Sequence, residues 1–395
     1  MTPAPDERRA AAAPGAAGAT AGATAGATVI FAGGGTGGHL YPGLAIAQAL
    51  VRLQPSVGAF FVGARRGVER DVLPRYPYPY ELLDLHPLYR PRIWENWRTV
   101  RGAARAWGAL GALVRRTAPR LVVGTGGYAS GLTLAYAVAH RIPIVQQIAD
   151  SFPGLTARRF ARFSRECYLG YPEAARVVRR GKETVLVDTG NPIEPPPDPR
   201  PDRAAARAAW RVPPADACVL LIVGGSQGAR GINVVIDAWL ERGLPDGIFL
   251  IWATGRGQYD RFAARDGTHV RVVPYLSPIA DAYAATDVAL ARAGAMTTAE
   301  LCAWGLPMIL VPLPSAAADH QSANARALAA AGAAVHVPQD ALTTDALDRL
   351  AIEVMRAPEI RRRLASGAVA RGRPRAAEDI AQRILNLLSF IQFHS

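Results

Sequence analysis

Residues 29–47 read VIFAGGGTGGHLYPGLAIA, and this stretch decides the fold. A short β-branched and aromatic run comes first, then five glycines around one threonine, then a run rich in alanine, leucine and isoleucine. That order is typical of a strand, a tight loop and a helix. Glycine backbone can approach a ligand closely, and the following helix points free N–H groups at any anion there. The stretch therefore predicts a loop that cradles a phosphate or a sugar.

The same loop satisfies the spacing of a dinucleotide-binding fingerprint, because Gly33, Gly35 and Gly38 stand as G-x-G-x-x-G. That fingerprint also needs an acidic residue about 20 positions later, at the end of the second strand, to hold a ribose. We expect the second strand at residues 59–62, and no Asp or Glu occurs between Gly38 and Glu69. NAD is therefore not the expected ligand.

Length and composition indicate an ordinary globular protein with room for two domains. The chain has 395 residues, half of them apolar, and a net charge of +13 carried almost wholly by arginine. Such a charge is compatible with nucleic acid, an anionic membrane face or a polyanionic substrate, and does not choose among them. Three widely spaced cysteines fit a reducing compartment. With no signal-peptide pattern and no apolar run of membrane-spanning length, we expect a cytoplasmic protein.

The chain divides into five parts by composition. Residues 1–27 are an Ala/Gly/Pro/Thr-rich tail expected to be disordered. Residues 28–194 and 202–370 each alternate short apolar runs with helical ones, and residues 195–201 form a proline-rich linker. We expect an α/β protein with two Rossmann-like domains facing a central cleft. Residues 371–395 contain a last helix, at 376–393, that could pack back on the first domain.

Nine strands and one clear helix can be placed in this pattern. The helix is expected at 97–116. The strands are expected at 29–32, 59–62, 120–123, 142–146, 217–223, 248–253, 270–274, 288–291 and 308–311.

Further loop sequences follow several of these strands. They are GTGGYASG at 124–131, GGSQGA at 224–229, RAGAMTTAEL at 292–301 and DHQSANA at 319–325. A single glycine-rich loop is weak support for a ligand site, since tight turns between strands and helices also use glycine. Three such loops at strand ends in two halves predict a cleft that holds a diphosphate and a sugar.

In order and wording, these motifs resemble those of the GT-B glycosyltransferases. Within them they are most similar to the MurG family, which adds N-acetylglucosamine to the lipid-linked muramyl precursor of peptidoglycan. The segments GARRGVE at 63–69 and TGNP at 189–192 are similar as well. The resemblance covers about residues 29–370. It implies a GT-B fold, a UDP-N-acetylglucosamine donor in the C-terminal half and a lipid-diphosphate acceptor against the N-terminal half.

The resemblance also implies a set of donor-binding residues. Ser226 and Gln227 lie near the diphosphate together with backbone N–H groups of Ala295, Met296 and Thr297, and residues Thr36, Gly37 and Gly38 of the first loop belong to the same set. Glu300 accepts both ribose hydroxyls, which suits a carboxylate, although Thr297-x-x-Glu300 also reads as a helix capping box. Gln321 and Asn324 hold sugar hydroxyls, or else form an exposed polar turn.

On the acceptor side the resemblance implies Gly35, Tyr128, Ser130, Asp150 and Asn191. In this part of the chain the sequence departs from the family's pattern. The family usually carries His-Glu-Gln-Asn before Pro-Gly-Leu-Thr, whereas this chain has Gln-Ile-Ala-Asp at 147–150, and Glu194 stands where the family has an arginine. The acceptor, or the activity itself, could therefore differ from the family's.

Direct displacement at an anomeric carbon inverts its configuration and requires a base for the acceptor hydroxyl. His39 follows the glycine loop directly and titrates near neutrality, so we expect it to be that base, the alternative being a histidine that merely caps the loop. Helix N-termini and loop amides can stabilise the departing diphosphate. Since no Asp-x-Asp motif stands out, we expect neither a metal nor another cofactor to be required.

A basic and aromatic stretch at residues 89–107 is the candidate for membrane contact. We expect peripheral binding at the cytoplasmic face of the plasma membrane, a lipid-linked diphosphate as partner, and no nucleic acid. An ordinary helix with buried tryptophan and solvated arginine is the alternative. The residues chosen for the patch are Ile93, Trp94, Trp97, Arg98 and Arg101.

Three other functions remain open at this point. One is a sugar-nucleotide transferase with a different lipid acceptor, and another is a UDP-sugar epimerase on the same fold. The third is an inactive homologue that binds UDP-sugar or the membrane as a scaffold, to which the changed residues 147–150 lend support. Intact His39, Glu300 and Gln321 argue against the inactive version.

Overall fold

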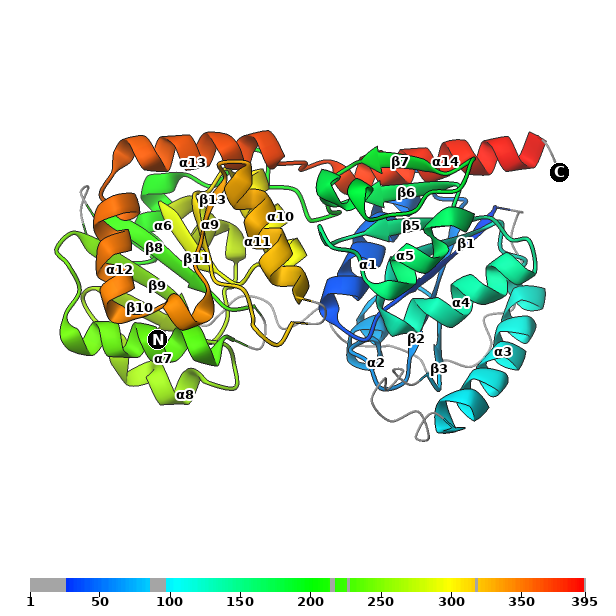
Figure 1. The fold of residues 1–395 in the computed structure, drawn as a ribbon, viewed down its shortest axis with the longest axis horizontal. Coiled ribbons are helices and arrows are strands. Elements are labelled where there is room, and N and C mark those ends of the chain that lie inside the picture. The colour runs from blue at the N-terminus through cyan, green and yellow to red at the C-terminus, as the bar shows by residue number, and fades with distance from the viewer. Residues whose placement is uncertain (1–25, 86–96, 214–216, 226–227, 317–318, 394–395) are drawn as a thin grey trace, which may run out of the picture.

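The computed structural model describes residues 26–85, 97–213, 217–225, 228–316 and 319–393, with backbone only at 97–101 and 392–393. It shows two lobes, each built on one sheet (Figure 1). Almost all of the tail predicted at 1–27 lies outside the described residues. Within the described part of the chain, no helix is both long and apolar enough to span a bilayer.

The N-terminal half is built on a parallel sheet with the strand order β3-β2-β1-β4-β5-β6-β7. Its strands are β1 (Thr28–Gly33), β2 (Gly58–Ala64), β3 (Tyr80–Leu83), β4 (Leu121–Gly126), β5 (Ile144–Ile148), β6 (Glu166–Leu169) and β7 (Val185–Asp188).

The C-terminal half repeats the plan with the order β10-β9-β8-β11-β12-β13, again parallel. Its strands are β8 (Cys218–Val223), β9 (Ile248–Ala253), β10 (Val270–Val273), β11 (Val288–Ala291), β12 (Met308–Leu310) and β13 (Ala334–His336). The predicted α/β architecture with two Rossmann-like units is thereby confirmed.

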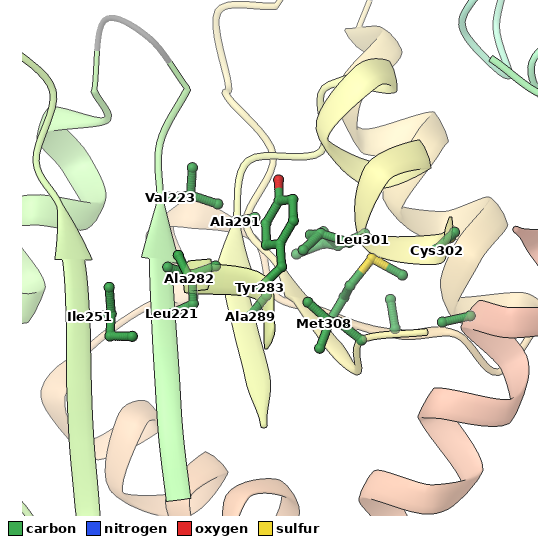
Figure 2. Close-up of a cluster of buried hydrophobic side chains, with 14 of the residues drawn as sticks. Leu221, Val223, Ile251, Ala282, Tyr283, Ala289, Ala291, Leu301, Cys302 and Met308 are labelled. Atoms are coloured by element: carbon green, nitrogen blue, oxygen red, sulfur yellow. The ribbon is translucent and has the colours of Figure 1, made fainter. Parts of the chain in front are cut away.

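Both faces of each sheet are covered, so the central strands are apolar without alternation. In β1, Val29 and Phe31 join one buried cluster while Ile30 and Ala32 join another on the opposite face. In the C-terminal half, one cluster packs strand residues against α9 (Ile279–Ala285) and α10 (Ala295–Trp304). Figure 2 shows Tyr283 of α9 standing between strand residues and Leu301 of α10.

The longer helices cross between strands and cover the sheets. The expected helix at 97–116 is observed as α3 (Trp97–Thr117). The remaining α-helices are α1 (Gly37–Leu53), α2 (Glu69–Val72), α4 (Gly127–Ala139), α5 (Leu155–Phe160), α6 (Arg203–Ala209), α7 (Arg230–Arg242), α8 (Tyr259–Phe262), α11 (His320–Ala330), α12 (Thr344–Leu350), α13 (Pro358–Arg371) and α14 (Ala376–Phe393).

The chain passes between the halves twice. The first passage lies between β7 and α6 and contains the proline-rich residues 195–201. The second lies between α13, on the C-terminal lobe, and α14, which runs along the N-terminal lobe (Figure 1). Ile380 and Ile384 of α14 are buried in the same cluster as Phe31 and Leu44. The last helix therefore packs on the first half of the chain.

Several expected boundaries were wrong, and four strands were missed. Strand β4 runs on to Gly126 rather than ending at 123, because its glycines still pair with β1 across a shifted register. Strand β5 begins after Pro143, two residues later than expected. The missed strands are β3, β6, β7 and β13, of only three or four residues each, too short to show a clear period.

Candidate active site

The two sheets each have one point where the strand order reverses, between β1 and β4 and between β8 and β11. In open α/β sheets, ligands bind at the carboxyl ends of the strands on either side of such a point. The glycine-rich segments found there are residues 33–38, which join β1 to α1, residues 124–127, which join the end of β4 to α4, the segment that follows β8 from residue 224, and residues 292–294, which follow β11. Topology therefore places the loops that the sequence singled out at the two expected ligand-binding positions.

The first glycine loop is held by a residue that sequence reasoning missed. Glu69, the first residue of α2, is completely buried, and its Oε1 accepts the N–H groups of Gly35 (2.9 Å) and Ala64 (3.0 Å). The dinucleotide fingerprint carries its acidic residue at the end of the second strand, and β2 ends at Ala64, before Glu69. The Glu69 carboxylate turns into the protein and fixes the loop.

His39 lies in the first turn of α1, in contact with the second glycine loop. Its Nδ1 is 3.0 Å from the Thr36 hydroxyl, and its carbonyl accepts a hydrogen bond from Thr125 Oγ1 (2.6 Å). The imidazole ring packs on Gly126, where a Cβ would lie 2.6 Å from the ring carbon Cδ2. Gly126 also has a φ of 97°, so glycine is required there for both reasons.

The pKa of His39 is lowered, chiefly because burial disfavours the charged ring. Asp150 and Glu69 raise it, while His320 lowers it. Asp150 follows β5 of the N-terminal half and His320 begins α11 of the C-terminal half. Burial therefore favours the neutral form of the His39 ring, and residues from both halves influence its charge.

In the C-terminal half, α10 begins immediately after the loop that follows β11. Its N-cap is Gly294, and its first backbone hydrogen bond runs from Thr298 N–H to the Gly294 carbonyl (3.0 Å). The N–H groups of Ala295, Met296 and Thr297 precede that bond and project from the helix N-terminus. Because Thr297 lies inside the helix, the capping-box explanation of Thr297 and Glu300 is wrong.

Glu300 lies on α10 and pairs with Tyr283 of α9. The Tyr283 hydroxyl donates to Glu300 Oε2 at 2.7 Å. Burial raises the pKa of Glu300, the Tyr283 hydrogen bond lowers it and the charge of Glu194 raises it. Glu194 is the residue that stands where the resembling family has arginine. One oxygen of the Glu300 carboxylate, Oε2, is thus oriented by the tyrosine hydroxyl.

Asn324 joins the two halves rather than facing an open cleft. It is completely buried; its Oδ1 accepts Ser151 N–H (2.8 Å), and its Nδ2 donates to Asp150 Oδ1 (2.9 Å) and to the Ala293 carbonyl (3.1 Å). The expected sugar contact of Asn324 is not what this geometry shows. Gln321, one turn earlier, uses its Oε1 to accept Leu313 N–H (3.0 Å) and stays partly exposed.

The residues expected on the acceptor side also differ in whether their side chains are already engaged in hydrogen bonds within the protein. Gly35 and Tyr128 lie together, since a Cβ on Gly35 would come within 2.7 Å of the tyrosine ring. Ser130 is buried and donates to the Gly127 carbonyl (3.0 Å). Asn191 is buried between the halves, accepting from Gln147 Nε2 (2.8 Å) and donating to the Ala149 carbonyl (3.0 Å). The side chains of Ser130 and Asn191 therefore hold neighbouring segments of the protein in place.

Some expected site residues cannot be placed. Ser226, Gln227, Ile93 and Trp94 lie outside the described residues. The remaining patch residues, Trp97, Arg98 and Arg101, belong to α3, whose first five side chains are likewise not described.

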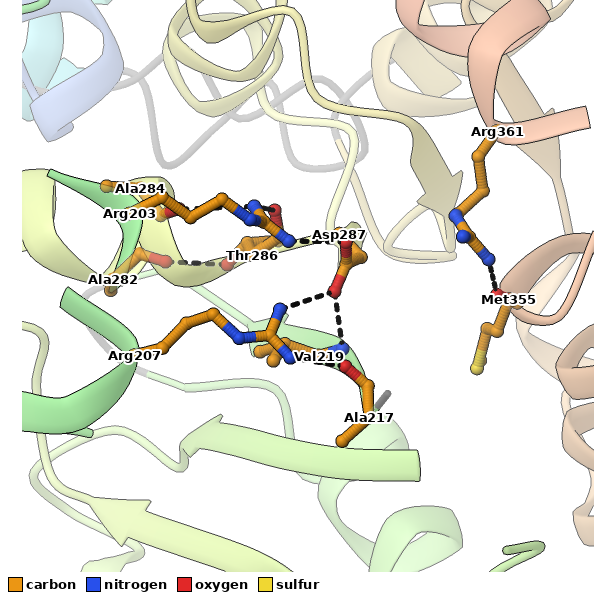
Figure 3. Close-up of polar contacts among 10 residues, drawn as sticks. All are labelled: Arg203, Arg207, Ala217, Val219, Ala282, Ala284, Thr286, Asp287, Met355 and Arg361. Carbon is orange, nitrogen blue, oxygen red and sulfur yellow. Dashed lines mark hydrogen bonds and ion pairs between the residues drawn. The ribbon is translucent and has the colours of Figure 1, made fainter. Parts of the chain in front are cut away.

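A pocket of about 990 Å³ lies at the opposite edge of the C-terminal sheet, where the strands begin. Its arginines are already engaged, as Figure 3 shows. The Asp287 carboxylate accepts from Arg203 (2.6 Å), Arg207 (3.2 Å) and Val219 N–H (2.8 Å), while Arg361 donates to the Met355 carbonyl. These contacts tie α6 to the strand ends, and the pocket lacks the glycine loops of the cleft.

Comparison with known proteins gives matches over both halves of the chain. Residues 29–169 match the glycosyltransferase family 28 N-terminal domain, and residues 219–383 match the glycosyltransferase family 28 C-terminal domain. A UDP-N-acetylglucosamine–N-acetylmuramyl-(pentapeptide) pyrophosphoryl-undecaprenol N-acetylglucosamine transferase of Moorella thermoacetica is 39% identical over 373 residues, covering 90% of this chain and 98% of that protein. The transferase of the same name from Salinibacter ruber is 37% identical, covering 91% and 96%.

Among solved structures, Acinetobacter baumannii MurG superposes with a TM-score of 0.73 at 24% identity, covering 91% of this chain and 99% of that one. At that identity the likeness shows the fold, which is the expected GT-B arrangement of two Rossmann-like domains.

Proposed function

This chain belongs to glycosyltransferase family 28 and is a hexosyltransferase, and on that premise we propose that it transfers N-acetylglucosamine from UDP to a lipid-linked muramyl-peptide acceptor in peptidoglycan synthesis. The curated relatives carry the name of this reaction and are matched over almost their whole length. The product is the disaccharide-bearing lipid intermediate.

The observation that carries the proposal is that the two halves meet beside His39. Asn324 of α11 binds Asp150 and Ser151 of the first half, and Asp150 and His320 both act on the charge of His39. The N-terminus of α10 and Glu300 belong to the second half. A base on the first half and anion-binding N–H groups on the second suit transfer from a nucleotide-sugar to a hydroxyl.

The chemistry is a single displacement at the anomeric carbon. The acceptor hydroxyl oxygen forms the new bond to that carbon, while the bond to the UDP oxygen breaks and UDP leaves with the electron pair. We assign the hydroxyl proton to His39, whose lowered pKa keeps it neutral and able to accept. Attack from the face opposite UDP inverts the configuration.

Donor binding uses the C-terminal half in this proposal. The N–H groups at the start of α10 face the diphosphate, where the positive end of the helix stabilises negative charge. Glu300 holds the ribose and Gln321 a sugar hydroxyl. Because these N–H groups meet the charge that develops on UDP, we propose that the reaction needs no metal and no other cofactor.

The acceptor carries a lipid, so we place the enzyme peripherally on the cytoplasmic face of the plasma membrane. Residues 89–107 remain our candidate contact, with no nucleic acid involved. Within the described side chains of that stretch, Trp107 is 37% exposed and its ring lies 4.9 Å from that of Tyr136. An exposed indole supported by a second aromatic ring suits a membrane interface.

A UDP-release assay tests the proposal. UDP should appear only when UDP-N-acetylglucosamine and the lipid-linked muramyl acceptor are both present, and not with UDP-glucose, UDP-galactose or a lipid diphosphate lacking the muramyl sugar. Since Gln147 to Asp150 depart from the family sequence, the acceptor panel decides most. Transfer to a different acceptor, or none to any, would contradict the proposal.

A further inference from the structure

The buried carboxylate of Glu69 has an unusual environment. Both N–H groups that it binds, those of Gly35 and Ala64, reach the same oxygen, Oε1. The other oxygen, Oε2, is buried and has no hydrogen-bond partner in the described part of the chain, and no described cation pairs with Glu69. A buried, unpaired charge is costly, so its retention calls for a compensating role.

Three glycines leave room for this side chain. A Cβ on Gly34 or Gly67 would overlap the Glu69 carboxylate, and one on Gly63 would lie 2.8 Å from its Cγ. Gly34 lies in the first glycine loop, Gly63 lies near the end of β2, and Gly67 lies between β2 and α2. The surrounding backbone thus encloses one carboxylate in one position.

The enclosed carboxylate connects to His39 through the loop itself. Glu69 holds Gly35, and the next residue, Thr36, is the N-cap of α1 and lies beside the His39 ring. The loop also meets the second glycine loop closely, since a Cβ on Gly127 would overlap the Gly34 carbonyl oxygen. Displacement of Gly35 would therefore move the support of the histidine as well as the loop N–H groups.

We propose that Glu69 is a positioning residue for the transfer reaction: its buried carboxylate fixes the first glycine loop so that His39 meets the acceptor hydroxyl. This inference rests on the proposed function. Glu69 touches neither substrate, and it acts by holding Gly35 and by its charge. The pKa of His39 supports the second effect, because Glu69 and Asp150 raise it against burial and against His320.

Gly67 offers a way to displace the carboxylate without deleting it. Its φ lies outside the left-handed region, so Gly67→Ala adds only a Cβ, and that Cβ meets Glu69. Glu69→Ala removes the carboxylate, while Glu69→Gln keeps an acceptor oxygen for both N–H groups and removes the charge. Gly58→Ala is the matched control, since a Cβ on Gly58, at the start of β2, would meet nothing closer than 3.7 Å.

The expected results form a cycle. Glu69→Ala and Gly67→Ala should each lower kcat by about 10–100-fold, the usual effect of misplacing a catalytic group by about 1 Å. The KM for UDP-N-acetylglucosamine should stay within about two-fold, and the double variant should be no slower than Glu69→Ala alone. Glu69→Gln should retain most of kcat but shift the acid limb of the pH profile to lower pH. Gly58→Ala should behave like wild type.

Direct titration of the His39 ring by NMR gives a readout that needs no turnover. Labelled histidine, with His39 assigned by His39→Gln, should titrate at lower pH in Glu69→Gln than in wild type. If the titration moves but no acceptor is glycosylated by wild type, the proposed function fails, and only the effect of the Glu69 charge on His39 stands. If wild type is active while Glu69→Ala and Gly67→Ala are folded and turn over within two-fold of it, or their effects add, the inference is overturned.

Discussion

Replacement of Glu300 tests whether the C-terminal half holds the ribose of UDP through this residue. The test must separate the loss of a ligand contact from the loss of the hydrogen bond to Tyr283. Glu300→Ala removes the ribose acceptor and also strips the buried Tyr283 hydroxyl of its partner. Glu300→Gln keeps an oxygen for Tyr283 and loses only the charge. Comparing the two variants distinguishes ligand recognition from support of the fold.

The magnitudes follow from the contacts. Hydrogen bonds to a charged group contribute about 1.5–3 kcal/mol, so Glu300→Ala should weaken UDP binding by about 10–150-fold. The orphaned Tyr283 hydroxyl should cost about 1–3 kcal/mol of folding stability in the same variant. In Glu300→Gln the neutral hydrogen bonds that remain contribute about 0.5–1.5 kcal/mol, so the loss of affinity should be about ten-fold and Tm nearly unchanged.

Isothermal titration with UDP and with 2′-deoxy-UDP provides the assay. Wild type should bind the deoxy analogue more weakly, and Glu300→Ala should bind both alike, because its partner for the 2′-hydroxyl is gone. Binding of UDP to wild type should also weaken on acidification at a pH above the ordinary range of glutamate, since the pKa of Glu300 is raised mainly by burial. If Glu300→Ala still discriminates against the deoxy analogue as strongly as wild type, Glu300 does not hold the ribose.

Three further predictions concern the base, the metal and the membrane. His39→Ala should lower kcat by about 10²–10⁴-fold with UDP-sugar affinity intact, and near-normal turnover of this variant would exclude His39 as the base. The wild-type rate should fall on acidification only at a pH below the ordinary range of histidine, because burial lowers the pKa of His39. Chelation with EDTA should change the rate less than two-fold if N–H groups alone stabilise UDP, and a loss restored by Mg²⁺ would contradict this. Loss of basic residues from 89–107 should reduce binding to anionic vesicles only, whereas loss of tryptophan should reduce binding to neutral ones too; unchanged binding by folded variants would place the contact elsewhere. The variants are Arg90→Gln, Arg92→Gln, Arg98→Gln and Arg101→Gln together, and Trp94→Ala with Trp97→Ala.

The architecture could be predicted from the sequence because the buried strands of a parallel sheet form continuous apolar runs. Fully apolar runs such as residues 248–253 and 288–291 are strands with the expected bounds, since both faces of the sheet are buried there. The edge strands β3 and β7 are short and partly exposed. The continuous apolar pattern of a buried strand is lost where the strand is not fully buried. The glycines of β4 were assigned to a loop because sequence does not reveal that Gly33 and Gly126 continue the pairing.

The site was predictable to the level of loops, and less so to that of side chains. A motif indicates that a residue lies near the cleft, not which way its hydrogen bonds run. Asn324 was expected to bind sugar, yet its amide is engaged by Ala293 of its own half and by Asp150 and Ser151, which only the docking of the two halves brings to it. Glu69 could have been found in the GARRGVE segment as an acidic residue among glycines, but its burial depends on the packing of three separate segments.

The two passages of the chain between the halves touch each other, which limits how the halves can move. A Cβ on Gly190, from the first passage, would meet the side chain of Arg373, from the second, and Arg373 approaches Asp188 at 3.6 Å. Two connections that lie side by side act as a hinge between the halves. They resist sliding and twisting but permit rotation about the line that joins them. Any opening between the halves should therefore leave the residues beside these connections almost still, among them Asn191 and the start of α10 that it contacts, and move most the parts furthest from them.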